Sequence, residues 1–397
     1  MMHKPTGYQI CTRCVMDTSD PDIEFDDEGV CSHCYRADAI FSQYPFNLTK
    51  EEREIELKKI LDKIKQDGKG KPYDCVIGLS GGVDSSYLAY LAKKKFMLRP
   101  LAIHLDNGWD SELAIRNIEL LCKKLEIDLF TYVIDWEEFR DLQLSFLYAS
   151  TPDTEIITDH AIVTLFTKIP AQNGINFFLS GSNMETESTS IRQWSQGHAD
   201  WIYIKSIHKK FGKVPLKTYP YYDRMKLFFW KFIHPVRIID ILDYVHYNKN
   251  EAKKILKEEI GWRDYGGKHY ESLFTKFYQA YILPKKFGYD KRRMHLTSLI
   301  HSRQMTREEA LHELNKPLYT NEELNTDMNY VLSNLRISRN EFETIMKTPA
   351  KKYEDYPTSK TYLPYRMYDF FMKMWVDILI SLSSRVFSKL KKVMKIR

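Results

Sequence analysis

Residues 75–86 read CVIGLSGGVDSS, and this stretch decides how the chain folds. The apolar run 75–79 predicts a buried strand, and residues 87–92 (YLAYLA) predict a helix. Two adjacent glycines between a strand and a helix let the backbone approach a phosphate chain, because glycine has no Cβ and the helix N-terminus offers unpaired N–H groups. The Walker pattern GxxxxGKS/T is absent, so the sequence predicts a phosphate-binding turn of another kind. The alternative is an ordinary Gly-Ser turn.

The composition is that of a folded protein with room for more than one structural unit. The 397 residues are 43% hydrophobic and 28% charged, which suits two domains or one large domain with appendages. The net charge of +6 is modest for this length, so we expect a mixed solvated surface and no nucleic-acid partner. The N-terminus lacks a signal-peptide pattern, and no segment approaches about 18 uncharged apolar residues, so we expect a cytoplasmic protein.

Four of the six cysteines have metal-ligand spacing. They are Cys11, Cys14, Cys31 and Cys34, with two residues inside each pair and sixteen between the pairs. This spacing matches a tetrahedral four-thiolate zinc site, and a metal is what would order the polar loop between the pairs. Four protein ligands leave no open position, so the ion is expected to be structural. An iron–sulfur cluster is the alternative, and disulfides are disfavoured in a reducing cytoplasm.

Strand and helix patterns alternate from residue 75 onward. Before them, residues 49–66 predict an amphipathic helix with a capping box between Thr49 and Glu52. The expected strands are 75–79, 100–105, 128–134 and 175–180, and the expected helices between them are 85–95, 111–124 and 159–173. This alternation predicts an α/β fold with a doubly wound parallel sheet and ligands at the carboxyl ends of the strands.

Three polar segments follow the expected strands, and an ATP site needs such segments at one edge of a sheet. They are the 80–86 loop, residues 104–109 (HLDNGW) and residues 180–183 (SGSN). The candidate ATP-binding residues are Ser80, Gly81, Gly82, Val83, Asp84, Ser85, Ser86, His104, Asp106, Gly181 and Asn183.

Other residues are candidates for the chemistry. Asp84 is expected to assist an ATP–Mg²⁺ complex. Departing pyrophosphate needs cations, and the 80–86 loop has none, so Lys291 and Arg292 are candidate catalytic residues, with a solvated charged face as the alternative. The candidate substrate-binding residues are Glu187, Trp194, Lys268 and His269.

The second half of the chain reads as helical. Residues 194–230 are rich in aromatic side chains, and 296–347 predict helices with many charged positions. The tail 368–397 mixes large apolar residues with a basic end. Such a tail packs on its own domain or makes peripheral contact with an anionic membrane surface.

The motifs together resemble a known family. SGGVDSS resembles the PP-loop of the N-type ATP pyrophosphatases, which cleave ATP between the α- and β-phosphates. With the four cysteines, HLDNGW, GSNMETES and the stretch GWRDYGGKHYES…PKKFGYDKRRMHLTSLI, residues 8–345 resemble the N-acetyl sugar amidotransferases of bacterial surface-polysaccharide synthesis (lipopolysaccharide O-antigen or nonulosonic acid). The implied fold is the adenine nucleotide alpha hydrolase-like PP-loop fold.

We divide the chain on this basis into four parts. They are a zinc knuckle (1–48), a PP-loop ATP pyrophosphatase domain (49–190), a mainly helical substrate or partner region (191–350) and a basic amphipathic tail (351–397).

The resemblance implies an ATP-dependent ligase. It would convert the acetamido group of a sugar or nucleotide sugar into an acetamidino group through an O-adenylated intermediate, using ATP, Mg²⁺ and a structural Zn²⁺. We recognise no N-terminal cysteine nucleophile and no Cys-His-Glu glutaminase segment. The resemblance therefore implies a separate glutaminase and a barrel-type ammonia-channelling subunit, similar to the pair in histidine biosynthesis.

Two other functions compete with this interpretation. A PP-loop tRNA thiolase needs a sulfur-carrying cysteine or a cluster near the loop, but the remaining cysteines, Cys75 and Cys122, read as buried packing residues. A non-catalytic nucleotide sensor or scaffold is disfavoured by the intact SGGVDSS.

Overall fold

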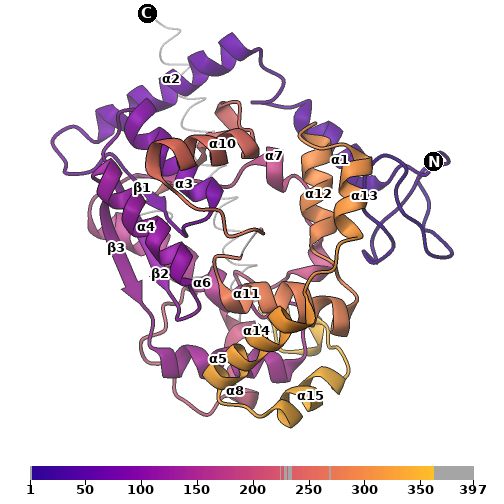
Figure 1. Ribbon diagram of the computed structural model, residues 1–397. Helices are drawn as coiled ribbons and strands as arrows, with labels where there is room; N and C mark the ends of the chain where they lie inside the picture. The colour runs from indigo at the N-terminus through magenta and orange to yellow at the C-terminus, as the bar shows by residue number, and fades with distance from the viewer. Residues whose placement is uncertain (1, 224, 228–229, 231–234, 268–269, 362–397) are drawn as a thin grey trace, which may run out of the picture.

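A five-stranded parallel sheet lies on one side of the computed structural model, which describes residues 2–223, 225–227, 230, 235–267 and 270–361 (Figure 1). The strands are β1 (Cys75–Gly78), β2 (Pro100–Asp106), β3 (Asp128–Val133), β4 (Phe177–Ser180) and β5 (Arg237–Asp240). Their order is β3-β2-β1-β4-β5, and every neighbouring pair is parallel. The four expected strands are confirmed with bounds shifted by a residue or two, whereas β5 is too short to give a periodic signal.

Helices cover both faces of this sheet. Alternate residues of β1 point to opposite faces, so Ile77 packs in a core with α3 and α4, while Val76 packs in a core with α6. The helices of this half are α2 (Lys50–Asp67), α3 (Val83–Tyr90, extended by a π turn over Leu91–Lys95), α4 (Glu112–Leu125) and α6 (Ile156–Gln172). The doubly wound arrangement is confirmed, as is the Thr49–Glu52 capping box of α2, in which each side chain accepts the backbone N–H of the other.

A second, larger core lies among the helices beyond the sheet. It gathers around α5 (Trp136–Ala149), which packs with α8 (Trp201–Phe211), α11 (Leu273–Phe277), α14 (Asn321–Leu335) and α15 (Arg339–Lys347). We did not predict α5, because it is buried on most sides and lacks the one-sided apolar stripe that marks a surface helix. Its buried Glu138 and Asp141 accept backbone N–H groups from Thr218 and Lys213, so the polar residues are satisfied inside the fold.

Shorter elements complete the chain. The remaining helices are α1 (Ser32–Phe41), α7 (Met184–Glu187), α10 (Lys249–Ile255), α12 (Arg292–His301) and α13 (Arg307–Leu314). The 3-10 and π segments are Arg192–Trp194, Ile241–Tyr244, Leu256–Ile260, Tyr278–Phe287 and Tyr353–Asp355. Helices α12 to α15 confirm the helical character of 296–347. The tail 368–397 lies outside the described residues, and none of the described helices has the length and apolar content needed to cross a membrane.

The N-terminal segment is docked on α12 and α13 (Figure 1). The guanidinium of Arg307 donates to the carbonyl oxygens of Cys11 at 2.9 Å and Cys14 at 3.1 Å. The neighbouring Arg293 donates to the carbonyl oxygen of Val15 at 2.7 Å and pairs with Asp17 at 3.0 Å. The cysteine segment therefore depends on residues almost three hundred positions further along the chain.

Candidate active site

The PP-loop turns the backbone from β1 into α3. Gly82 is the N-cap of α3 and has no side chain with which to cap the helix. In the first turn, the backbone N–H of Val83 donates to the hydroxyl of Tyr265. Ser80 Oγ accepts the N–H of Gly82 at 3.2 Å, and Ser85 Oγ donates to the carbonyl oxygen of Gly82 at 3.1 Å. Gly81 has a φ of +80°, and a Cβ there would lie 2.8 Å from the carbonyl oxygen of Ala114. Loop and helix thus form a backbone cradle of the kind that binds phosphate.

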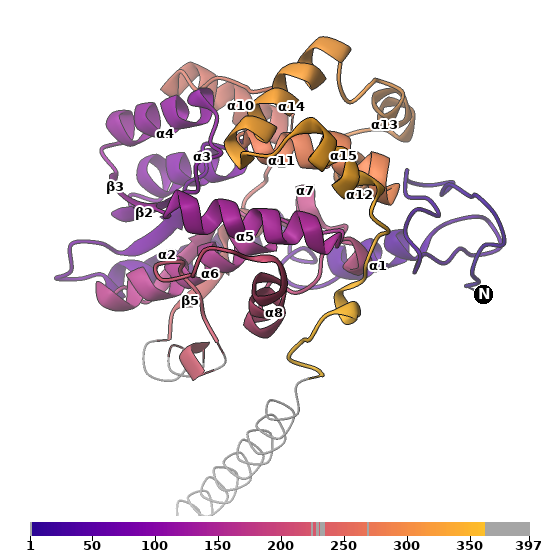
Figure 2. The same cartoon turned by 90° about the horizontal axis from the view of Figure 1, so that it is seen from below.

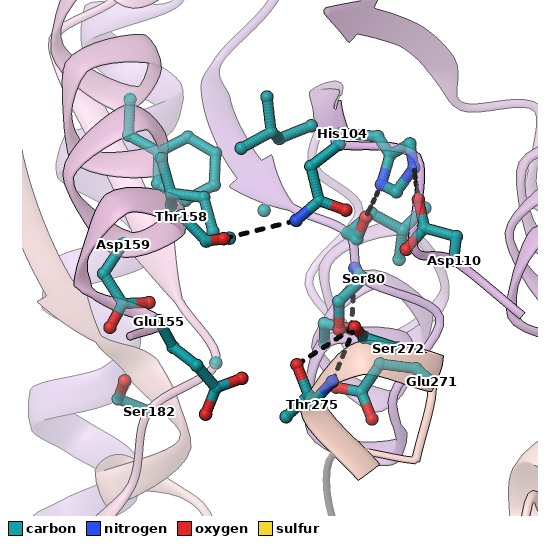
Figure 3. A pocket seen from close by; sticks show the side chains of 18 of the residues that line it. Ser80, His104, Asp110, Glu155, Thr158, Asp159, Ser182, Glu271, Ser272 and Thr275 are labelled. Carbon is teal, nitrogen blue, oxygen red and sulfur yellow. Dashed lines mark hydrogen bonds and ion pairs between the residues drawn. The ribbon is translucent and has the colours of Figure 1, made fainter. Parts of the chain in front are cut away.

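A cavity of about 420 Å³ opens at the carboxyl ends of β1, β2 and β4, and we call it the sheet-edge cavity (Figure 3). One wall is the PP-loop with Ser80 and Ser85. The floor is an apolar slot made of Ile103, Leu105, Ile162, Phe166 and Phe178. An apolar slot beside a phosphate cradle has the chemistry that a purine nucleotide needs.

His104 fixes the end of β2 against β1. Its Nδ1 lies 2.9 Å from the carbonyl oxygen of Leu79, and because a carbonyl only accepts, Nδ1 carries a proton. Its Nε2 lies 3.2 Å from Oδ2 of Asp110. Burial lowers the pKa of His104, but the hydrogen bond and charge of Asp110 outweigh burial and the pKa is raised overall. The pairing with Asp110 thus favours the charged form of this imidazole beside the PP-loop.

The opposite wall of the sheet-edge cavity is acidic. Glu155 and Asp159, at the start of α6, face the PP-loop across the cavity (Figure 3), and Asp153 lines the same cavity. Lys291 Nζ lies 4.0 Å from Glu155 Oε2, and His198 Nε2 lies 3.2 Å from Asp159 Oδ2. Burial raises the pKa of Asp153, whose Oδ2 accepts a hydrogen bond from the hydroxyl of Ser195. This wall suits positively charged groups.

A smaller cavity of about 190 Å³ lies on the other side of the PP-loop, and we call it the loop cavity. It shares Ser80, Ser85, Gly181, Ser182 and Glu271 with the sheet-edge cavity. Its other lining residues are Gly82, Val83, Asp84, Glu187, Lys249, Lys253, Asp264, Tyr265 and Gly267. Lys253 pairs with Asp264 at 2.6 Å, and the hydroxyl of Tyr247 donates to Asp84 Oδ1. The loop cavity therefore brings lysines of α10 to a loop that has no cation in its own sequence.

The structure brings together many of the residues singled out from sequence. Those that line one or both cavities are Ser80, Gly82, Val83, Asp84, Ser85, His104, Gly181, Glu187 and Lys291. Lys249, Lys253, Asp110, Asp153 and Glu155 were missed, since isolated charged residues in the sequence carry no signal of what they face.

Other candidates lie outside the cavity walls. Ser86 is fully buried in α3, and Gly81 turns its carbonyl to the indole N–H of Trp262 at 3.0 Å. Asp106 accepts the N–H of Gly108 at 2.9 Å, and Asn183 caps α7 by accepting the N–H of Thr186 at 2.9 Å. These residues shape the loops around the site from behind.

Arg292 and Trp194 are placed differently from our expectation. The guanidinium of Arg292 pairs with Asp290 at 2.8 Å and donates to the carbonyl oxygens of Glu313, Leu314 and Lys316, so it holds the end of α13 instead of facing the cavity. Trp194 is buried against the cysteine segment and stacks on Tyr289. Lys268 and His269 lie outside the described residues.

The four cysteines converge on one point. Their Sγ atoms all lie within 4.8 Å of one another, with Cys11–Cys34 at 3.7 Å and Cys14–Cys31 at 3.6 Å. Four thiolates at about 2.3 Å from a single tetrahedral ion stand about 3.8 Å apart, so the set fits one metal ion. The ring of His301 lies 3.4 Å from Cys34 Sγ. All four cysteines are buried, so the cluster has the geometry and the burial of a structural metal site.

The other two cysteines are unsuited to sulfur transfer. Cys75 is fully buried in β1, and burial raises its pKa well above the usual range. Burial also raises the pKa of Cys122, to about 11. Both are therefore thiols at neutral pH, whereas a sulfur-carrying cysteine reacts as thiolate. Neither Cys75 nor Cys122 therefore suits the sulfur-carrying role that a tRNA thiolase needs.

Two family models match separate parts of the chain. A family model of NAD synthase matches residues 56–143, which include the PP-loop. A family model described as the C-terminal domain of WbpG-like lipopolysaccharide biosynthesis proteins matches residues 271–374. The fold and the match over 56–143 indicate a PP-loop protein that is similar to the NAD synthases. Its C-terminal part is of the WbpG-like kind, and it links the chain to lipopolysaccharide biosynthesis.

Individual relatives are distant. An uncharacterized protein of Methanocaldococcus jannaschii is 26% identical over 189 residues, which are 47% of this chain and 64%, less than two thirds, of that relative. Among solved structures, an NH3-dependent NAD synthetase from Campylobacter jejuni is 14% identical, with 68% of this chain and 98% of that chain covered and a TM-score of 0.30. A tRNA thiolase from Methanococcus maripaludis is 15% identical, with 63% and 80% covered and a TM-score of 0.28.

We predict that Gly81→Ala destabilises the protein more than Gly70→Ala. Both glycines have a φ near +80°, but a Cβ at Gly70 meets no atom within 4 Å, whereas at Gly81 it meets the Ala114 backbone. The control, Gly70→Ala, should lower the free energy of unfolding by about 1–2 kcal/mol through left-handed strain alone. Gly81→Ala should lower the free energy of unfolding, measured in urea, by at least about 1 kcal/mol more. Equal losses in the two variants would show that the loop does not pack on α4 as described.

Proposed function

We propose that this chain is an ATP-dependent amidotransferase that converts the acetamido group of a sugar into an acetamidino group in surface-polysaccharide synthesis. The observation that carries the proposal is the make-up of the sheet-edge cavity. Its PP-loop wall suits a nucleotide phosphate chain, and its acidic wall suits a cationic reactant and product. The WbpG-like match over 271–374, which includes Glu271 and Lys291, supports the polysaccharide context.

The proposed reaction solves a leaving-group problem. An amide carbonyl is a poor electrophile, and its oxygen does not leave unaided. In the proposal the amide oxygen attacks the α-phosphorus of ATP, and pyrophosphate leaves. Ammonia then adds to the resulting imidate carbon, one proton passes to a base, and AMP departs with the original amide oxygen. The protein contributes alignment and charge stabilisation.

The charge distribution supports one orientation of the reactants. Ammonium and the amidinium product are both cations, and the wall of Asp153, Glu155 and Asp159 would attract them. The same wall would repel a triphosphate, which is better placed over the PP-loop. Asp153, whose pKa is raised, is a candidate to take the proton that ammonium must lose.

The loop cavity would receive the pyrophosphate end of ATP. Lys249 and Lys253 line it, and cations there would stabilise charge on the leaving pyrophosphate. Asp84, Glu187 and Glu271 offer carboxylate oxygens on the same cavity, the donor type that Mg²⁺ prefers. Mg²⁺ held there with the triphosphate would neutralise phosphate charge.

We propose that ammonia comes from a separate glutaminase through a barrel-type channelling subunit, in the cytoplasm. The support is the resemblance of the sequence, together with an acidic wall suited to capturing ammonium at the sheet-edge cavity. The chain alone should then accept ammonium salts but not glutamine.

The function is tested by incubating the full chain with ATP, Mg²⁺, an ammonium salt and a panel of diacetamido sugars. Pyrophosphate release should require both sugar and ammonium, and mass spectrometry should find a product in which one oxygen has been replaced by NH. Sugar-independent pyrophosphate release, or an unchanged sugar mass across the panel, would contradict the proposal.

A matched pair of variants tests the cavity assignment in the same assay. Lys291→Met should lower kcat/KM by about tenfold or more, because it removes the lysine that faces the carboxylates. Arg292→Met should lower the unfolding free energy, because it frees the carbonyl groups at the end of α13, but leave the kcat/KM of the folded protein nearly unchanged. The reverse result would place the cation function at Arg292.

We infer that the ion held by the four cysteines is zinc. Sulfur–sulfur distances near 3.7 Å are those of one tetrahedral ion, and zinc is the usual ion of four-cysteine structural sites. Because Arg293 and Arg307 tie the cysteine segment to α12 and α13, the ion should stabilise those helices as well.

Metal analysis of the purified protein should find about one zinc ion per chain. Cys31→Ser should lose the metal and lower the thermal unfolding midpoint, because it removes one of the four converging sulfurs. Cys122→Ser is the matched control and should retain it, since Cys122 lies on α4 outside the cluster. Iron with inorganic sulfide in place of zinc would refute the assignment.

A further inference from the structure

A third cavity, of about 440 Å³, lies next to the sheet-edge cavity, and we call it the aromatic cavity. It is lined by Pro21, Asp22, Thr151, Pro152, Asp153, Gln193, Gln196, Tyr203, Phe287, Tyr289, Ala350, Lys351, Lys352 and Tyr353. These residues come from the cysteine segment, the loop after α5, the segment before α8, α8 itself and the WbpG-like part. Figure 2 shows the segment after α15, in gold, running past the end of α5.

The two cavities share one wall. Asp153 lines both, and Ser195 faces the sheet-edge cavity while its neighbours Gln193 and Gln196 face the aromatic cavity. The hydroxyl of Ser195 donates to Asp153 Oδ2, which joins the two segments of the wall. A substrate bound in the aromatic cavity would place one group at this shared wall, next to the sheet-edge cavity.

The aromatic cavity has a platform of stacked rings. Phe287 and Tyr289 are partly exposed, with ring centroids 6.1 Å apart and an interplanar angle of 24°. Trp194 stacks behind Tyr289 at 4.8 Å and 19°, and is itself fully buried. Trp194 therefore holds the platform in place from behind. A flat aromatic surface is where the apolar C–H face of a sugar ring packs.

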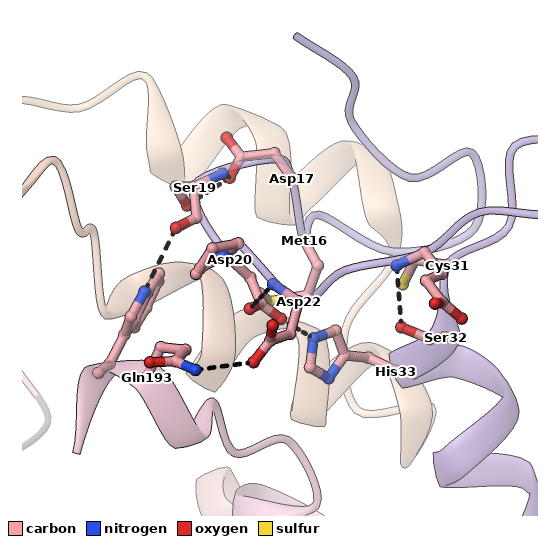
Figure 4. A network of polar contacts seen from close by, with 12 residues as sticks. Met16, Asp17, Ser19, Asp20, Asp22, Cys31, Ser32, His33 and Gln193 are labelled. Atoms are coloured by element: carbon pink, nitrogen blue, oxygen red, sulfur yellow. Dashed lines mark hydrogen bonds and ion pairs between the residues drawn. The ribbon is translucent and has the colours of Figure 1, made fainter. Parts of the chain in front are cut away.

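Polar groups surround this platform. Gln193 Nε2 donates to Asp22 Oδ2 at 3.0 Å (Figure 4), and Gln196 Nε2 donates to Gln193 Oε1 at 3.2 Å. Amide and carboxylate groups at fixed positions supply both donors and acceptors, as sugar hydroxyls require. At the rim, Lys351 and Lys352 are exposed and add positive charge.

From these contacts we propose that the aromatic cavity binds the ring of an acetamido sugar that carries an anionic substituent. The ring lies on Phe287 and Tyr289, the anionic group meets Lys351 and Lys352, and the acetamido group reaches the shared wall at Asp153. The proposal rests on the proposed function for the identity of the reacting group. The anion is a phosphate of a nucleotide-linked sugar or the carboxylate of a sugar acid, and both have the charge that the rim lysines recognise.

The test measures binding to the full chain by calorimetry and saturation-transfer NMR. The probes are UDP-N-acetylglucosamine, N-acetylneuraminic acid and N-acetylglucosamine, with ATP titrated separately. Lys351→Glu combined with Lys352→Glu should raise the Kd of the anionic probe that fits by about tenfold or more and leave that of ATP unchanged. Weaker binding of UDP-N-acetylglucosamine to the double variant would identify the recognised anion as a phosphate. Weaker binding of N-acetylneuraminic acid would identify it as a carboxylate. Lys94→Glu combined with Lys95→Glu makes the same charge change at exposed positions of a helix end and should have no effect.

A second variant blocks the cavity by size. Ala350 is exposed at the rim, so Ala350→Trp should abolish binding of the sugars without affecting ATP, whereas Ala350→Ser should bind as the wild type does. Failure of all three probes to bind the wild type, or binding that survives Ala350→Trp, would overturn the proposal.

The outcomes also separate this proposal from the proposed function. Sugar binding that is blocked by Ala350→Trp, without any amidine product, would retain the cavity and refute the reaction. Amidine formation with a sugar KM that Ala350→Trp leaves unchanged would retain the reaction and refute the cavity.

Discussion

The parallel pairing of β1 with both β2 and β4 is the constraint on which the site depends. Ile77 pairs with Ala102 on one side and with Leu179 on the other, so the three strands end at one level of the sheet. The PP-loop, His104 and the Ser180–Ser182 turn therefore meet at one edge, and the hydrogen bond from His104 Nδ1 to the carbonyl oxygen of Leu79 adds to the strand pairing there. The Gly81 backbone can then pack on Ala114 of α4 and hold the cradle open.

The sheet and the loop could be predicted because their signals are local. Strand runs, the glycine pair and the cysteine spacing each lie within a few tens of residues. The lysines of α10 could not be predicted, because Lys249 and Lys253 reach the loop cavity only when α10 packs near α3. Arg292 and Trp194 were predicted to lie in the site but support the fold instead, because the sequence pattern around such a residue is the same in both cases. Only the structure shows that Trp194 is buried against Tyr289 and that Arg292 binds carbonyl groups at the end of α13.

The cysteine segment, α12 and α13 pack and hydrogen-bond with one another outside the sheet. The four cysteines share a core with Ile191 and Trp194, and Arg293 and Arg307 bind their segment to α12 and α13. Lys291 immediately precedes α12, and Phe287 and Tyr289 lie just before it. A metal bound by the cysteines would thus support Lys291 at the carboxylate wall and Phe287 and Tyr289 at the aromatic cavity. On this account, the sheet supplies the nucleotide site and the surrounding segments supply selectivity.

The proposed reaction transfers the amide oxygen of a sugar to AMP. An acetamido sugar whose amide oxygen carries a heavy-oxygen label would be incubated with the full chain, ATP, Mg²⁺ and ammonium, and the AMP analysed by mass spectrometry. If the amide is activated as an O-adenylate, the label appears in the phosphate of AMP in proportion to the amidine formed. Unlabelled AMP, with the label retained in the sugar or released to water, would contradict it.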